Sequence, residues 1–122
     1  MSIRFSTDHV WIETLNSVVR VGITEHAQEA LGDIVFVQFP QVGEEFAKNA
    51  VLAVIESVKA AADVVIPVGA KVLKINDQLV DNPGLVNSDP LASGWLAELE
   101  LSDPAQVSEL MDSSAYLKFC EN

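Results

Sequence analysis

Cysteine, basic residues and long apolar runs are all scarce in this chain of 122 residues. The single cysteine, Cys120, excludes an internal disulfide, and its place near the C-terminus suits an incidental thiol better than a nucleophile. No stretch approaches the ~20 apolar residues of a membrane-spanning helix, and the first residues lack the patterns of a signal peptide or a transit peptide. We therefore expect a soluble cytoplasmic protein with no membrane partner.

Positive charge is in short supply. The chain has 7 basic residues against 18 acidic ones, which gives a formal net charge of −11. Such a field repels polyphosphates and anionic lipid headgroups, so we expect no nucleic acid partner. The same field favours encounters with basic patches on other proteins, although an acidic surface more often serves solubility alone.

Residues suited to catalysis or metal binding are also few. His9 and His26 do not stand at metal-ligand spacing, and no serine or cysteine lies in a known nucleophile motif. The six glycines form no phosphate-binding pattern. We therefore predict no catalytic residue and no metal site. His26 is expected to be solvated, and His9 to pack beside Trp11.

Short runs of Val, Ile and Phe, separated by Gly, Pro, Asn and Asp, make up most of the chain, a pattern typical of an all-β sandwich or barrel. These runs are more continuous than strict alternation, which favours strands covered on both faces. The length fits one domain over residues 1–122, and residues 77–94 are expected to form a long surface loop. The predicted strands are 10–13, 17–23, 34–39, 50–58, 64–67, 71–75 and 95–101.

Two helices interrupt the strands. Residues 25–31 have Thr24 as an N-cap and Gly32 just past the end, where a positive φ is accessible to glycine. A C-terminal helix is predicted to start at Asp103, followed by a proline at its first position and by Gln106 as the glutamine of a capping box.

Residues 56–63 are ambiguous, because Glu, Ser, Lys and three alanines would make a respectable helix by propensity. β-Branched residues on both sides instead favour two strands joined by a tight turn. Lys59 would then lie at or near a hairpin tip. An attachment lysine needs exposure, a rigid base and small neighbours, and this position offers all three. From composition alone, an ordinary surface lysine is the more frequent case.

Three parts of the sequence together resemble one family: a segment around Lys59, the stretch before it and the stretch after it. The lysine segment is Glu56-Ser57-Val58-Lys59-Ala60, with Asp63 and Pro67. The preceding residues are Val21-Gly22-Ile23-Thr24, Ala27-Gln28, residues 31–37, Pro40 and Gly43. The following residues are Pro83-Gly84-Leu85-Val86-Asn87, Asp89-Pro90, Gly94-Trp95-Leu96 and Tyr116. From about residue 5 to residue 119 the chain thus resembles the glycine cleavage H proteins, and the lysine segment resembles their lipoyl-attachment segment.

The resemblance implies a mainly β fold, a flattened barrel-sandwich hybrid of the lipoyl-domain type with a short internal helix and a C-terminal helix. It implies lipoic acid bound covalently to Lys59, with a supporting segment made of Glu56, Ser57, Val58, Ala60 and Asp63. The chain would be a single lipoyl-carrier domain, a monomer, and a carrier rather than an enzyme.

The implied function is to carry the aminomethyl group of glycine on lipoyllysine. The implied partners are the pyridoxal-phosphate glycine decarboxylase, the tetrahydrofolate-dependent aminomethyltransferase, dihydrolipoamide dehydrogenase and a lipoate-attaching enzyme. Tethering the reactive group raises its effective concentration at each docked active site.

Two positions depart from the family pattern. Val10 replaces an acidic residue expected near the parked arm, which would cost ~1.5–3 kcal/mol of arm sequestration. Ala70 stands where the family has glycine, and would be strained by roughly 1–2 kcal/mol if that site needs a positive φ that Gly69 has not taken over.

Other functions remain as alternatives. These departures give some weight to an H-like paralogue that relays lipoyl or acyl groups to other proteins. An unmodified adaptor is a further alternative, against which the intact lysine segment speaks. A biotinyl domain fits less well, because its target lysine is typically flanked by methionines and Lys59 is flanked by Val58 and Ala60. An autonomous enzyme would need an acid, base and nucleophile constellation that is not found.

Overall fold

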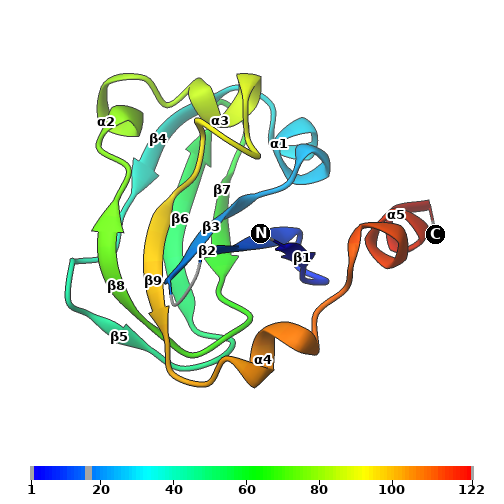
Figure 1. Cartoon of the computed structure of the whole chain (residues 1–122). Helices are drawn as coiled ribbons and strands as arrows, with labels where there is room; N and C mark the ends of the chain where they lie inside the picture. Colours follow the sequence, from blue (N-terminus) through cyan, green and yellow to red (C-terminus); the bar gives the residue numbers. More distant parts are fainter. Residues whose placement is uncertain (1, 16–17, 122) are drawn as a thin grey trace.

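The computed structural model of the chain describes residues 2–15 and 18–121, and its nine strands form two antiparallel sheets (Figure 1). In sheet order, the larger sheet consists of β1 (Ser2–Phe5), β2 (Val10–Leu15), β3 (Val18–Ile23), β9 (Ala97–Leu101), β8 (Ala70–Ile75) and β5 (Glu45–Phe46). The smaller sheet consists of β4 (Ile34–Gln38), β6 (Val51–Ser57) and β7 (Ala61–Val65). The mainly β fold class is confirmed.

The helices in the described part of the chain are short and lie around the sheets: α1 (Glu25–Leu31), α2 (Gln78–Asp81), α3 (Leu85–Ser88), α4 (Ala105–Ser108) and α5 (Ser113–Glu121). The predicted loop 77–94 therefore contains two helical turns. The C-terminal helix predicted from Asp103 is the single turn α4, and the last helix begins ten residues later, at Ser113. Within residues 2–15 and 18–121, no helix is long and apolar enough to cross a membrane.

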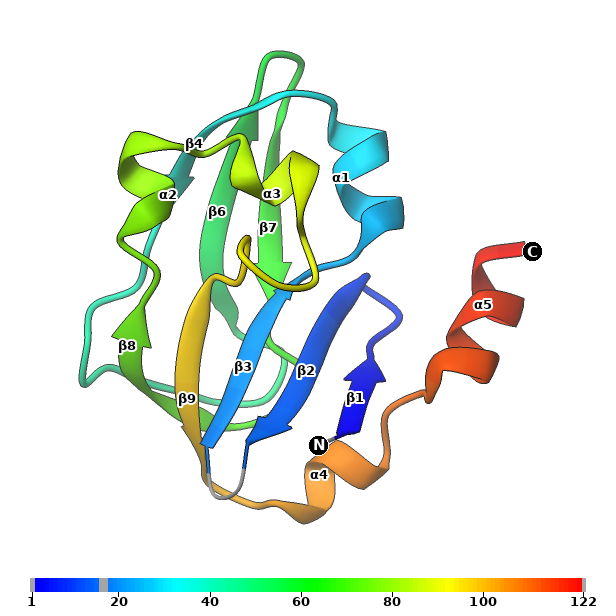
Figure 2. The same ribbon diagram turned by 45° about the horizontal axis from the view of Figure 1, so that its top comes forward.

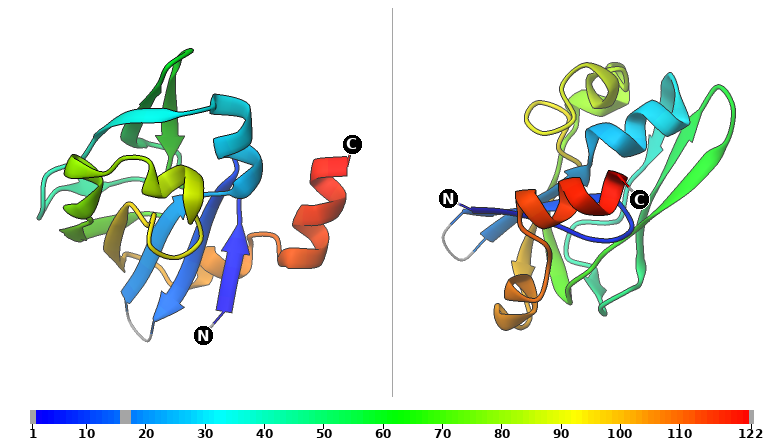
Figure 3. Two further views of the ribbon diagram at one scale, coloured as in Figure 1. Left: turned by 90° about the horizontal axis from the view of Figure 1, so that it is seen from above. Right: turned by 90° about the vertical axis from the view of Figure 1, so that its right-hand side faces the viewer.

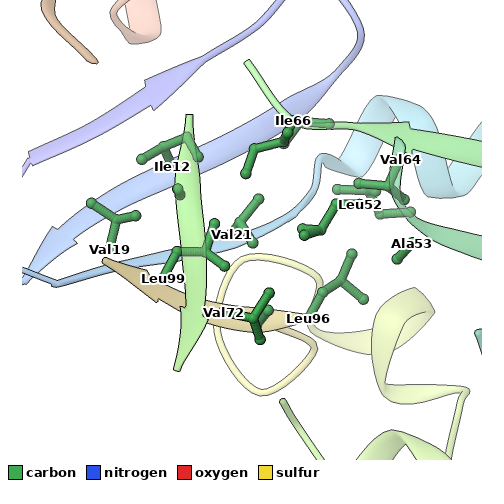
Figure 4. Close-up of a cluster of buried hydrophobic side chains, with 14 of the residues drawn as sticks. Ile12, Val19, Val21, Leu52, Ala53, Val64, Ile66, Val72, Leu96 and Leu99 are labelled. Atoms are coloured by element: carbon green, nitrogen blue, oxygen red, sulfur yellow. The ribbon is translucent and has the colours of Figure 1, made fainter. Parts of the chain in front are cut away.

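The core lies between the two sheets, where side chains from both point toward one another (Figure 4). Ile12, Ile55, Val72 and Leu99 are each fully buried there. Burial of one such side chain stabilises the fold by ~1.5–3 kcal/mol. The continuous apolar runs of the sequence thus reflect strands that face a shared interior.

A second, smaller cluster joins the two ends of the chain. Phe5 of β1 stacks on Tyr116 of α5 with ring centroids 4.5 Å apart, and Phe5 also exchanges backbone hydrogen bonds with Met111. Trp11 completes the cluster and donates its indole N–H to the Pro90 carbonyl at 2.9 Å. Figure 2 shows α5 beside β1, at the side of the larger sheet.

The predicted caps are partly confirmed. Thr24 accepts a hydrogen bond from the backbone N–H of Ala27, and Gly32 has φ +79° and donates to the Gln28 carbonyl, as a helix end of this kind requires. Gln106, in contrast, does not return to Asp103. Its side-chain oxygen accepts from the backbone N–H of Gly69 at 2.7 Å, so this half of the predicted capping box is wrong.

Candidate functional site

The turn between β6 and β7 carries Lys59, which confirms the hairpin and excludes the helix for this segment. Ser57 closes the turn: its backbone N–H and its hydroxyl both donate to the Ala60 carbonyl, at 2.8 and 3.1 Å. Its hydroxyl oxygen accepts from the backbone N–H groups of Lys59 and Ala60, at 3.2 and 3.1 Å. One serine therefore pairs with two N–H groups and one carbonyl of the turn, which local polar side chains do well.

The tip also contacts the connection between α1 and β4. The backbone N–H of Val58 donates to the Asp33 carbonyl at 3.0 Å. The Lys59 side chain lies over Gly32, because a Cβ added to that glycine would come within 3.1 Å of the lysine Cε. The lysine stem thus lies over bare backbone just past the end of α1, and the end of the β6–β7 hairpin projects beyond the other elements (Figure 2).

Asn87, on α3, fixes the segment on which the tip rests. Its side-chain oxygen accepts from the backbone N–H of Ile34 at 2.8 Å, and its amide donates to the Gly32 carbonyl at 2.8 Å and to the Gln28 side chain at 2.9 Å. The joined groups lie in α1, at its C-cap and at the start of β4. This role was missed from the sequence, whose only signal was the place of Asn87 in the matched motif.

The proposed supporting residues lie on the β6–β7 hairpin at different distances from the lysine. Val58, Lys59 and Ala60 are exposed, and no ion pair to Lys59 is found within the described ranges. Glu56 and Ser57 are half-buried at the end of β6. The exposed Asp63 lies across from Val54, two positions farther from the tip than Ala61. An exposed amine on a hydrogen-bonded turn with small neighbours fits covalent attachment of an acyl group.

A cluster of aromatic rings beneath α5 was not predicted. His9 stacks on His26 with centroids 4.3 Å apart, and its Nδ1 is 2.7 Å from the Tyr116 hydroxyl. That hydroxyl is also 2.7 Å from the Thr24 hydroxyl. Trp11, beside which we expected His9, instead lies against Gly22, where an added Cβ would be 2.7 Å from the indole.

Burial governs the titration of this cluster. Desolvation, followed by the nearby His26, lowers the pKa of His9, while Asp8 acts in the opposite direction. Burial raises the pKa of Tyr116 to about 12, with Cys120 adding to the rise and Thr24 opposing it. Within the described part of the chain, no group of three or more His, Cys, Asp or Glu residues could hold a metal ion.

The two departures from the family pattern lie in the interior. The Val10 side chain is 1% exposed and belongs to the core, so in this chain position 10 does not present its side chain at the surface. Ala70 is also buried and has no positive φ; it pairs with Leu101 and Phe46. The condition for strain at Ala70 is therefore not met.

Comparisons with known proteins agree with this geometry. Residues 3–122 match the family model described as glycine cleavage H-protein. Two relatives are described as glycine cleavage system H proteins. The one from Halothermothrix orenii is 45% identical over 98% of this chain, and the one from Thermotoga maritima is 46% identical over 96% of it. Each alignment covers 94% of the relative's length. A mitochondrial one from Arabidopsis thaliana is 42% identical over 98% of this chain and 76% of its own.

A solved structure shows the same architecture. The crystal structure of a glycine cleavage system H protein from Mycobacterium marinum superposes with a TM-score of 0.88 and 34% identity, over 99% of this chain and 98% of that protein. With this agreement and the family match over nearly the whole length, the chain belongs to the glycine cleavage H-protein family.

Proposed function

We propose that this chain is the lipoyl-bearing carrier of a glycine cleavage system, with the lipoyl group on Lys59. The observation that supports it most directly is the exposed lysine on a turn pinned by Ser57, in a chain that belongs to this family. When bound, the lipoyl group supplies a disulfide that receives the aminomethyl group of glycine and passes it on.

The residues of the chain have three tasks in this proposal. Lys59 Nζ, as the free amine, attacks the acyl carbon of an activated lipoate, forms an amide, and releases a proton and the activating group. Ser57 and Asn87 hold the turn and its base, so that motion is confined to the side chain beyond the backbone. The bare Cα of Gly32 leaves room for the lysine stem.

We also propose the partners of the carrier and the compartment in which it acts. The carrier would be a monomer that visits the glycine decarboxylase, the aminomethyltransferase and dihydrolipoamide dehydrogenase in turn, in the cytoplasm, and would catalyse none of these steps itself. Val10 and Ala70 do not favour a second function, because both pack in the interior without backbone strain.

The test is an intact-mass spectrum with peptide mapping, after incubation of the protein with a lipoate ligase, lipoate and ATP. We expect one lipoyl increment, located on Lys59. The matched variant is Lys59→Arg, which keeps the charge and the fold and should gain no mass and support no glycine decarboxylation. Increments on another lysine, or decarboxylation supported by Lys59→Arg, would contradict the proposal.

A further inference from the structure

The three-stranded sheet has an inner and an outer face that the strand register defines. Val37, Ile55 and Ala62 lie across from one another, and the first two are buried in the core. The alternate positions point the other way, because successive side chains of a strand face opposite sides. The outer row nearest the tip is Phe36, Glu56 and Ala61.

This outer face is apolar and open next to the lysine. Phe36 is 53% exposed, Val35 at the bulge of β4 is 52% exposed, and Val58 at the tip is 66% exposed. Val54 and Val65 continue the same face as half-buried side chains. In the right-hand view of Figure 3 the β6–β7 hairpin forms an outer margin of the molecule, with the helices on its other side. Exposed apolar groups gathered in this way mark interaction surfaces.

The charges on this face have one sign. Strands β4, β6 and β7 contain no lysine or arginine, whereas Glu56 and Asp63 lie on the outer face and Asp33 lies at its edge. Lys59 is the basic residue of the connecting turn. The ion pairs Arg20–Glu98 and Lys48–Glu109 involve none of these carboxylates. The face therefore suits a partner whose apolar contact surface is bordered by basic side chains.

The length of the lysine side chain selects one partner. An enzyme that modifies the bare amine must bring its active site within the reach of a four-carbon stem, so its surface has to touch the residues around the tip. Enzymes that act on the finished arm meet its far end and can dock elsewhere.

We propose that the outer face formed by Val35, Phe36, Val54, Val58 and Val65 is the surface on which the lipoate-attaching enzyme docks. This inference rests on the proposed attachment at Lys59. The apolar side chains supply the contact, as in the core of a protein interface, and Glu56 and Asp63 orient a basic rim of the partner.

Lipoylation kinetics test the inference. Purified unmodified protein is titrated against a lipoate ligase with lipoate and ATP, and kcat and KM for the carrier are measured separately. The double variant Phe36→Thr, Val58→Thr places a strand-compatible threonine at both positions, and we expect its KM to rise about tenfold or more with kcat nearly unchanged, because binding alone is lost. The single variant Val58→Thr, a near-isosteric change at the exposed tip, should raise KM by a smaller factor.

The matched controls are Leu73→Thr on β8 and Val80→Thr on α2, both exposed and both outside the face, which should stay within about twofold of wild type. Equal KM values for the wild type and the double variant Phe36→Thr, Val58→Thr would overturn the docking inference alone. A wild type that gains no lipoyl group would overturn the proposed function as well. If the double variant were lipoylated normally but had a raised KM with the glycine decarboxylase, the docking inference would also be overturned, since the face would then serve that later partner.

Discussion

Gly32 meets two separate requirements at the base of the lysine. Its φ of +79° and ψ of −155° lie in a region that is essentially restricted to glycine and costs other residues about 1–3 kcal/mol, and a Cβ added there would be 3.1 Å from the Lys59 Cε. Gly43 meets only the first requirement, because its φ is +93° and nothing lies within 4 Å of an added Cβ. Substitutions at these two glycines can therefore distinguish the effect of backbone strain from the effect of contact with the lysine.

We predict that Gly32→Ala and Gly43→Ala each lower the free energy of unfolding by about 1–3 kcal/mol, because both glycines have a positive φ. Only Gly32→Ala should also slow lipoylation, because it displaces the lysine stem. Chemical denaturation and initial rates of lipoylation measure the two effects. If both variants were lipoylated equally fast, Gly32 would have no role in positioning Lys59.

Asn87 shows why a single side chain can escape sequence-based prediction. It makes hydrogen bonds to Gln28, Gly32 and Ile34, which are more than fifty residues away in the sequence. Three such bonds contribute ~1.5–4.5 kcal/mol when each is worth 0.5–1.5. An asparagine in a polar loop has no local pattern that reveals such partners, so its role becomes visible only once the fold brings them together.

Helix α5 is held to the body of the protein by a small polar network set among aromatic rings. Tyr116 contacts His9 and Thr24 through its hydroxyl and Phe5 through its ring face. The charged and titratable groups around His9 are Asp8, His26 and Tyr116. Since burial and His26 together lower the pKa of His9, the folded protein disfavours the protonated ring.

The free energy of unfolding should therefore fall with pH below about 6.5, the ordinary pKa of histidine. In that range the unfolded chain binds a proton at His9 that the folded chain does not, and the loss ends once pH passes below the lowered pKa. His9→Asn tolerates the positive φ of 63° at this position and should show a shallower slope. Denaturation at a series of pH values measures it, and equal slopes in wild type and variant would assign the pH dependence to other groups.

The elements differ in how far the sequence could predict them. The helix 25–31 was predictable because Thr24 and Gly32 are local signals, and the hairpin because β-branched Val and Ile residues lie on both sides of the lysine segment. Strand β5 has only two residues, Glu45–Phe46, and is defined by its partner β8, so no local period could indicate it. The strand predicted at 17–23 is β3 from Val18 onward, with Ser17 outside the described residues.

The charge of the whole molecule bears on how fast partners find it. Eighteen carboxylates against seven basic residues give a field that reaches about 10 Å from the surface at 0.1 M salt and about 3 Å at 1 M. The acidic outer face next to Lys59 lies within this field.

We predict that kcat/KM for lipoylation falls several-fold between about 0.05 and 0.5 M salt, because steering of a basic partner is screened. At saturating carrier the turnover rate should change little, since docking is then complete, and this serves as the control. Salt-independent kcat/KM would limit the role of the net charge to solubility.

The two sheets also differ in the span of chain that each requires. The three-stranded sheet with the lysine turn is built from residues 34–65, whereas β3 and β8 flank β9, which is synthesised last among the strands. On the ribosome the hairpin can thus pair while the larger sheet still lacks a central member, and contacts between distant segments form slowly. During that interval Ile55 and its inward neighbours face water. A cell that makes this protein must finish nearly the whole chain before Lys59 stands on a stable base.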